Sequence, residues 1–249
     1  MTFEDIMGLT PANRDNYDAL VDALQMQTII PFVGAGMSYP YYPLWNTALE
    51  ELKKKVSPAQ IQQVEEEFRL AETEIDRCDA LEKALGKKAL CRYLCDIFNI
   101  SKFTDVEDPK LNEKAVSVLP RLFPKTPLVT TNLEKMMEEV YRIFKVPFHA
   151  SLKLTDKDII TVLQQQRAHG ILYLHGWVSG KMTDYDSLIF SKSQYEKHYQ
   201  PNSELVTVLH DWICGAQLLF LGCSLRNDRT LDILQAVYNN RKRLEHFAI

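Results

Sequence analysis

The sequence predicts an α/β fold in which a doubly wound, mainly parallel sheet carries a helical insertion after its first strand. Short apolar runs alternate with segments of helical periodicity, and each apolar run ends at small or polar residues. Buried parallel strands look like this because helices cover both of their faces. No linker rich in proline, glycine or serine interrupts the 249 residues. We therefore expect residues 1–249 to form a single domain, with the helical insertion at about residues 50–125.

Four apolar runs are the candidate strands, because they are short and rich in β-branched or aromatic residues. They cover residues 28–33, 127–130, 171–174 and 217–221. Residues 246–249 have the composition of one more strand, which starts where the sequence ends. Because a sheet seldom stops in the middle of a strand, we expect this chain to be the N-terminal part of a longer protein.

Seven segments have the apolar spacing of amphipathic helices, at residues 16–27, 44–55, 58–77, 79–98, 133–144, 202–214 and 228–238. Ser57, Pro58 and Gln60 match an N-cap, a proline at the first helical position and a capping box. This pattern predicts a helix that begins at Pro58. Thr131 and Glu134 are spaced as a second capping box, for the helix that follows them.

The charge and cysteine content narrow the class of protein. With 29 basic and 33 acidic residues the net charge is −4, so we expect no direct nucleic-acid partner, and the basic run at 241–243 is interpreted as a solvated helix end. No signal peptide or run of 18 apolar residues is present, which favours a cytoplasmic protein without a membrane partner. Five cysteines without a CxxC pair indicate reduced thiols. Cys91 and Cys95 have the spacing of two metal ligands, but core packing is the better interpretation, so no metal is expected.

The turn after the first strand is the first candidate binding site. It contains Gly34, Ala35, Gly36 and Ser38, and two glycines at such a bend let the backbone approach a pyrophosphate. The complete GxGxxG fingerprint is absent, so an ordinary strand-to-helix turn is an equally good interpretation.

Three further motifs follow the other strands. Asn132 follows the second strand, His175 and a glycine follow the third, and Gly222 and Ser224 follow the fourth. His175 is a candidate general base, although a lone histidine is more often structural. Because ligands of doubly wound sheets bind beyond the carboxyl ends of the strands, we expect all four motifs to share one site.

The order of the four motifs resembles that of the sirtuin superfamily, and the resemblance spans residues 29–232. It implies a Rossmann-like fold that binds NAD as its substrate. It also implies that Asn132 and His175 match the catalytic asparagine and histidine of that family. The resemblance places the first motif near the phosphates and the fourth near the adenosine half; the candidate NAD-binding residues are Gly34, Ala35, Gly36, Ser38, Thr131, Glu134, Gly222, Ser224 and Asp228.

Departures from the family pattern indicate which branch the chain resembles. The two CxxC pairs of the zinc module in protein-deacylating sirtuins are missing. Pro43, Leu44 and Trp45 are similar to the bacterial sirtuin-like domains of anti-phage systems. That resemblance implies an NAD hydrolase, a defence effector that cleaves the nicotinamide N-glycosidic bond to give nicotinamide and ADP-ribose. It also implies control by a homo-oligomer and by a C-terminal or separate sensor module.

Two alternatives stay open. In the first, the intermediate that forms when NAD loses nicotinamide is transferred to another acceptor or cyclised instead of being hydrolysed. The chain can also be a non-catalytic regulatory module that binds NAD or ADP-ribose, an alternative favoured by Glu134 standing where many relatives have aspartate. Tyr41 and Tyr42 stand where relatives tend to have glycine, and we expect their rings to close the cleft in a resting state.

Overall fold

In the computed structural model of the chain, residues 2–104, 110–153, 169–179, 182–200, 203, 205–207, 209–210, 216–225 and 246–249 are described. The helix predicted at 228–238, the basic run at 241–243 and Asp228 lie outside these residues. Of the helix predicted at 202–214, residues 205–207 and 209–210 are described and are helical.

The described strands form one six-stranded sheet with the order β3-β4-β2-β1-β5-β6. Each pair of neighbours is parallel, which confirms the doubly wound α/β fold. The strands are β1 Ile29–Val33, β2 Leu128–Thr130, β3 Ala150–Lys153, β4 Gly170–Tyr173, β5 Gln217–Leu221 and β6 Phe247–Ala248. The sequence did not predict β3, whose four residues are all only partly buried. Such a strand carries little apolar signal and is defined by its pairing with β4.

Alternate residues of the strands enter two separate cores, one on each face of the sheet. Val33 and Tyr173 belong to the larger core, whereas their neighbours Phe32 and Leu172 belong to the smaller one. Side chains alternate between faces along a strand, so a strand covered on both sides must be apolar at successive positions. This explains why the strands appear in the sequence as unbroken apolar runs.

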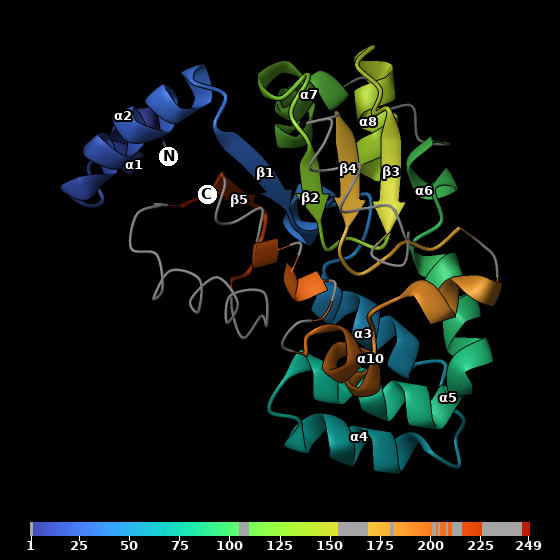
Figure 1. Cartoon of the computed structure of the whole chain (residues 1–249). Helices are drawn as coiled ribbons and strands as arrows, with labels where there is room; N and C mark the ends of the chain where they lie inside the picture. Colours follow the sequence, from blue (N-terminus) through green and yellow to red (C-terminus); the bar gives the residue numbers. More distant parts are fainter. Residues whose placement is uncertain are drawn as a thin grey trace.

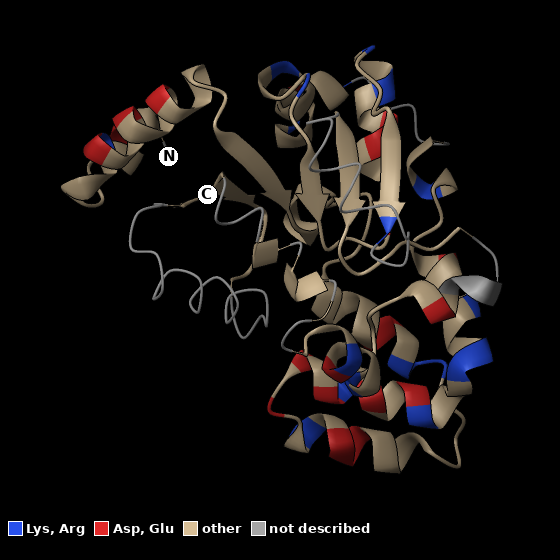
Figure 2. Cartoon of the chain, viewed as in Figure 1, with Lys and Arg blue, Asp and Glu red and all other residues tan. Residues whose placement is uncertain are grey.

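The helical insertion lies between β1 and β2. It comprises α3 Trp45–Lys53, α4 Ile61–Leu70, α5 Glu74–Ile97, α6 Ser101–Thr104, two short 3-10 turns at Leu111–Glu113 and Ala115–Val118, and α7 Leu119–Leu122. Helices α3, α4 and α5 lie beyond the carboxyl ends of the strands (Figure 1). Many of the charged side chains lie on α4 and α5, whereas the central strands carry none (Figure 2). The insertion therefore forms a layer across the edge of the sheet where a ligand is expected.

Two predicted helix starts in this layer are wrong. Residues 58–60 form a turn, closed by a hydrogen bond from the N–H of Gln60 to the carbonyl of Ser57, and α4 begins at Ile61. The next helix was expected to begin at residue 79, but α5 begins at Glu74, so the helix predicted over 58–77 is broken after Leu70. There the Thr73 hydroxyl accepts from the N–H of Asp76 while the Asp76 carboxylate accepts from the N–H of Thr73. This capping box starts a new helix.

The capping box predicted for Thr131 and Glu134 is also wrong. Helix α8, Met136–Ile143, begins at Met136, and Glu134 Oε2 accepts the backbone N–H of Met136 at 2.7 Å. The other carboxylate oxygen of Glu134 contacts Ser38 and Asn132. The side chain thus bonds to Ser38, a long-range partner that helix patterns do not reveal, instead of forming the predicted capping box with Thr131. After β4 come a 3-10 segment, Met182–Ser187, and α10, Lys192–His198; neither was predicted.

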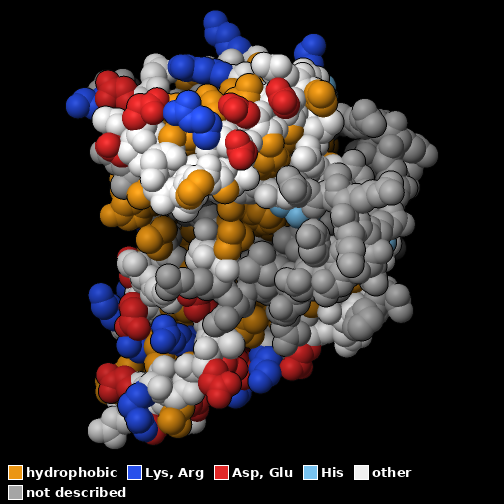
Figure 3. All heavy atoms as spheres, turned by 90° about the vertical axis from the view of Figure 1, so that its left-hand side faces the viewer, with side chains coloured by type: hydrophobic (Ala, Val, Ile, Leu, Met, Phe, Trp, Pro, Cys, Tyr) orange, Lys and Arg blue, Asp and Glu red, His pale blue; other side chains and the backbone are white. Residues whose placement is uncertain are grey.

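The N-terminal helices α1, Phe3–Met7, and α2, Ala12–Gln25, project from the body of the molecule (Figure 1). Only α2 was predicted, and it starts four residues earlier than expected. On the side of the molecule from which α1 and α2 project, hydrophobic side chains occupy a band between charged regions above and below (Figure 3).

No described helix combines the length and hydropathy needed to cross a membrane. Cys91 is fully buried in the larger core, and the described residues contain no His, Cys, Asp and Glu group able to hold a metal.

Candidate functional site

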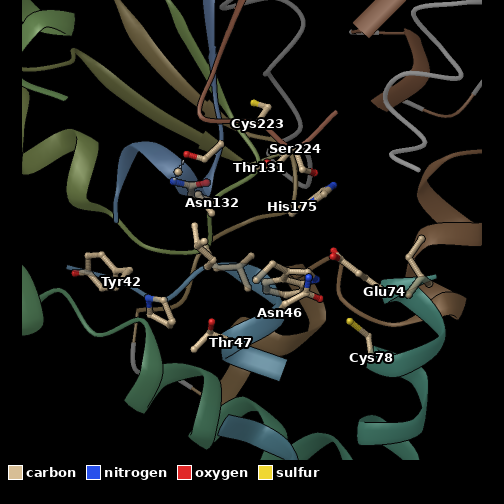
Figure 4. Close-up of a pocket in the computed structure, with 18 of the residues that line it drawn as sticks. Tyr42, Asn46, Thr47, Glu74, Cys78, Thr131, Asn132, His175, Cys223 and Ser224 are labelled. Atoms are coloured by element: carbon tan, nitrogen blue, oxygen red, sulfur yellow. Dashed lines mark hydrogen bonds between the residues drawn. The ribbon is translucent and has the colours of Figure 1, made fainter. Parts of the chain in front are cut away.

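A cavity of about 770 Å³ lies between the carboxyl ends of the strands and the helical layer. In Figure 4, Thr131, Asn132, His175, Cys223 and Ser224 line one wall, and residues from the helical layer line the opposite wall. Asp228 lies outside the described residues. The cavity brings together the other ten candidate residues; these are Gly34, Ala35, Gly36, Ser38, Thr131, Asn132, Glu134, His175, Gly222 and Ser224.

Strand register explains why Asn132 and His175 share this cavity. Thr130 of β2 pairs with Tyr173 of β4, and the backbone N–H of Leu174 donates to the carbonyl of Thr130 at 2.9 Å. Asn132 and His175 each stand two residues beyond this pair. Because neighbouring strands are about 4.8 Å apart, the register delivers both side chains to the same part of the sheet edge.

The glycine-containing turns after β1 and β5 pack directly against each other. A Cβ atom added to Gly34 would lie 2.7 Å from the carbonyl oxygen of Gly222, and one on Gly36 would lie 2.9 Å from the Gly222 Cα. The N–H groups of Gly34 and Gly36 donate to the carbonyls of Leu221 and Gly222, each at 2.9 Å. The glycines are therefore required by contact between two turns, a reason different from the approach to a pyrophosphate that the sequence suggested.

Asn132 is held by a hydrogen-bond network at the end of β2. Its Nδ2 atom donates to Glu134 Oε1 at 2.7 Å and lies 3.0 Å from Ser38 Oγ. Ser38 Oγ donates to the same Glu134 oxygen at 2.5 Å. Because the N–H end of the amide faces this cluster, its carbonyl oxygen is the end directed away from Glu134. Asn132 is thereby oriented as a hydrogen-bond acceptor.

The backbone at Asn132 is fixed as well. Its N–H donates to the Thr130 hydroxyl at 3.0 Å, and that hydroxyl donates to the carbonyl of Val33 at 2.8 Å. These bonds join the end of β2 to the end of β1. They position the asparagine relative to the glycine-containing turn.

Glu134 is a buried carboxyl group whose surroundings oppose its charge. Its exposed fraction is 2%. Burial raises the pKa of Glu134 above its ordinary value, and hydrogen bonds from Ser38, Met136 and Asn132 counteract this only in part. Among the described residues the group has no Lys or Arg partner within ion-pair distance. Its three donors therefore take the place of a counter-ion.

His175 lies against two tyrosines of the segment that contains α10. Its Nε2 atom is 2.8 Å from the Tyr199 hydroxyl, and its Nδ1 atom is 3.5 Å from the Tyr195 hydroxyl. The two tyrosine rings are stacked, with centroids 5.4 Å apart. Gly176 follows His175 at φ +72°, where a Cβ would overlap the carbonyl oxygen of Ser187. The sequence alone did not link α10 to the histidine, because this contact is long-range.

The expectation that Tyr41 and Tyr42 close the cleft is corrected by the structure. The Tyr41 ring packs edge-on against Phe103, with centroids 5.0 Å apart. Tyr42 is 1% exposed and donates its hydroxyl to the carbonyl of Asn99 at 3.0 Å. Packing against the helical layer anchors both rings, and Tyr42 contributes to a wall of the open cavity.

The wall formed by the helical layer contains residues that sequence reasoning missed. Asn46 and Thr47 belong to the first turn of α3, whereas Glu74, Arg77 and Cys78 belong to the start of α5. Burial raises the pKa of the Cys78 thiol, and neighbouring carboxylates add to this effect. No strand-end motif marks these positions, so only the folding of the insertion over the sheet edge brings them to the site.

Residues 126–249, about half of the chain, match the family described as SIR2-like domain. The matched part begins just before β2 and includes Asn132, His175 and the turn after β5. No curated protein matches the sequence.

Proposed function

Because the chain carries a SIR2-like domain, we propose that it is an NAD hydrolase that releases nicotinamide and ADP-ribose. A domain of this family is expected to have an NAD-related activity. The observation that carries the proposal is the convergence of Asn132 and His175 on one cavity beside the turn of Gly34 and Gly36. A cavity of about 770 Å³ is within the range of about 300–1,000 Å³ typical of ligand sites.

The reaction demands little acid catalysis from the protein. The bond that breaks joins the anomeric carbon of the ribose to the nicotinamide nitrogen, and nicotinamide takes the bonding electrons and leaves neutral. Water forms the new bond to that carbon and loses a proton. The protein must therefore hold a sugar that becomes positively charged and direct water to it.

Asn132 is proposed to orient the sugar or the water. Its N–H end is fixed on Glu134 and Ser38, so its carbonyl oxygen is the atom proposed to accept a hydrogen bond from a ribose hydroxyl or from the attacking water. Such an acceptor contributes by positioning, and small displacements of a positioned reactant cost about 100-fold in rate.

His175 is proposed to take the proton from water. A neutral imidazole has one N–H donor and one acceptor nitrogen. If Nε2 donates to the Tyr199 oxygen, Nδ1 keeps the lone pair that accepts the proton. The contact from Nδ1 to the Tyr195 hydroxyl is 3.5 Å, at the limit of a hydrogen bond. Tyr199 would thus select the tautomer that the reaction needs.

The direct test is to incubate the purified chain with NAD and to follow nicotinamide and ADP-ribose over time. His175→Ala should reduce nicotinamide release by about 10²- to 10⁴-fold, the usual contribution of a general base. His149→Ala, a change of an exposed histidine, is the matched control and should leave the rate unchanged. Wild-type rates in His175→Ala would remove the histidine from the reaction, and a cyclic product would replace hydrolysis by cyclisation.

A second candidate is a module that binds NAD or ADP-ribose without cleaving it. It is favoured by the position of His175, because both of its ring nitrogens lie within reach of tyrosine hydroxyls. Calorimetry that shows binding of NAD, together with mass spectrometry that shows intact NAD after long incubation, would support this candidate over hydrolysis.

The biological role that we propose is depletion of cellular NAD in anti-phage defence. This role is based on the resemblance of the sequence to the sirtuin-like domains of bacterial anti-phage systems. Expression of the gene product with and without phage infection tests this role. Cellular NAD should fall on infection with the wild-type protein and should stay constant with His175→Ala.

A further inference from the structure

We propose that Arg77 binds the pyrophosphate of the ligand, so that the helical insertion supplies the positive charge of the site. The inference rests on the proposed function and names the ligand group recognised by one residue. Among the described residues that line the cavity, Arg77 is the only lysine or arginine. It lies in α5, on the wall opposite the glycine-containing turn.

The side chain of Arg77 is held in position, but its hydrogen-bond donors are not fully used. Its Nε atom is buried and has no hydrogen-bond partner. Its guanidinium carbon lies 5.8 Å from the centre of the Phe68 ring, a cation-π contact that fixes the side chain from the α4 side. Burying an N–H donor without a partner is unfavourable. Because Nε itself is closed off from solvent, an anionic oxygen in the cavity would pair with the outer N–H groups of the guanidinium, which have no hydrogen bond or ion pair to any described residue.

The glycine-containing turn on the opposite wall has few donors left to offer a phosphate. The N–H groups of Gly34 and Gly36 donate to the turn after β5, and that of Met37 donates to the carbonyl of Gly34. The Ser38 hydroxyl donates to Glu134. The turn that sequence motifs assign to the phosphates is therefore largely committed to the fold. A pyrophosphate carries two negative charges, and Arg77 is the one positively charged group, among the described residues of the cavity wall, able to pair with them.

Acidic residues nearby do not cancel this charge. Glu72 and Glu74 line the same wall, but both are exposed, so water and salt screen them. Glu134 lies at the sheet side, and burial raises its pKa, which lowers its tendency to carry charge. The partly buried guanidinium is screened less than the exposed carboxylates. A ligand that extends from the strand ends to α5 would place its phosphates next to the Arg77 guanidinium.

The test compares ligands with and without a pyrophosphate. Binding of ADP-ribose and of adenosine to the whole chain is measured by calorimetry, for wild type, Arg77→Gln and Arg92→Gln. Arg92 is exposed on the same helix and is not among the cavity-lining residues, so both variants change the net charge equally. Arg77→Gln should weaken ADP-ribose binding by about 10- to 100-fold, as for loss of a charged hydrogen bond of about 1.5–3 kcal/mol.

Adenosine binding should change less than about twofold in the same variant, because adenosine has no phosphate. If Arg77→Gln does not fold, Arg77→Met keeps the aliphatic stem on Phe68 and gives the same comparison. Equal losses in Arg77→Gln and Arg92→Gln, equal losses for both ligands, or no ADP-ribose binding by the wild type would overturn the inference. ADP-ribose binding that depends on Arg77 without any NAD cleavage would uphold it and reject the proposed hydrolysis.

Discussion

The Nδ2 atom of Asn132 donates a hydrogen bond of 2.7 Å to Oε1 of Glu134, a carboxyl group that is 2% exposed. Ser38 donates to the same oxygen and the N–H of Met136 to the other. The candidate positioning residue is thus held by a buried acid. This arrangement gives Glu134 a role through Asn132, and it makes the site sensitive to any change of charge at position 132.

Asn132→Asp should strongly reduce nicotinamide release. The substitution places a second carboxyl group beside Glu134, and two carboxyl groups at this separation must share a proton or move apart. We expect a loss of about 100-fold or more in kcat, because the acceptor is displaced. Asn112→Asp adds the same charge at an exposed position and serves as the control. Activity near the wild-type level in Asn132→Asp would show that the asparagine does not position the reactants.

Glu134→Gln should change the pH dependence of stability. Because burial raises the pKa of Glu134 in the folded state, the folded protein binds more protons than the unfolded chain above the ordinary value of 4.5. The free energy of unfolding of the wild type therefore falls as pH rises from that value through the raised pKa. Relative to Glu134→Gln, the wild type should lose stability over this window in urea titrations.

A control for this experiment is Glu66→Gln. Glu66 is exposed, and a hydrogen bond from Arg69 lowers its pKa. The difference between the wild type and this variant should change in the opposite direction with pH. If the differences for both variants change alike, Glu134 is not the source of the effect.

Tyr199→Phe should lower kcat for NAD cleavage while KM changes little. The substitution removes the oxygen that lies 2.8 Å from His175 Nε2 but keeps the aromatic ring that stacks on Tyr195. Loss of one hydrogen bond of about 1 kcal/mol corresponds to about fivefold in rate. Tyr17→Phe, on the projecting helix α2, is the control. A faster reaction in Tyr199→Phe would mean that the hydroxyl restrains the histidine instead of orienting it.

Gly222→Ala should destabilise the protein more than Gly86→Ala. Both glycines have positive φ, +64° and +72°, so each alanine carries backbone strain of about 1–3 kcal/mol. A Cβ at Gly86 would meet nothing within 4 Å, whereas one at Gly222 would lie 2.5 Å from the backbone nitrogen of Met37. Thermal unfolding of the two variants measures the difference. Equal destabilisation would show that the turns after β1 and β5 adjust freely.

Local patterns were sufficient for the parts of the fold that are buried on both faces. β1, β2, β4 and β5 appear as apolar runs because alternate residues enter two different cores. The small or polar residues after these runs marked the sheet edge correctly, and ten candidate residues line one cavity there. Parallel pairing brings such strand ends together, so their position along the chain was enough to predict a shared site.

Helix boundaries and residue partners were predicted less well. The spacing of Thr131 and Glu134 matches a capping box, yet Glu134 bonds to Ser38, which is 96 residues away in the sequence. A long-range partner of this kind competes with the local cap, and the spacing of residues along the sequence does not reveal it. The short edge strand β3 was missed for a related reason, since its pairing with β4 defines it.

The sequence by itself thus determined the parallel sheet, its helical insertion and the sheet edge that carries Asn132 and His175. The pattern of buried residues along each strand depends on neighbouring residues, which is why it can be predicted, whereas the order of the strands in the sheet came from the structure. Only the tertiary structure decided that Glu134 orients Asn132, that Tyr199 contacts His175, and that α5 brings Arg77 to the cavity. The last two contacts join segments that are adjacent in space only after the insertion and α10 have packed over the sheet, and the Ser38 hydroxyl that shares the Glu134 oxygen comes from the distant turn after β1.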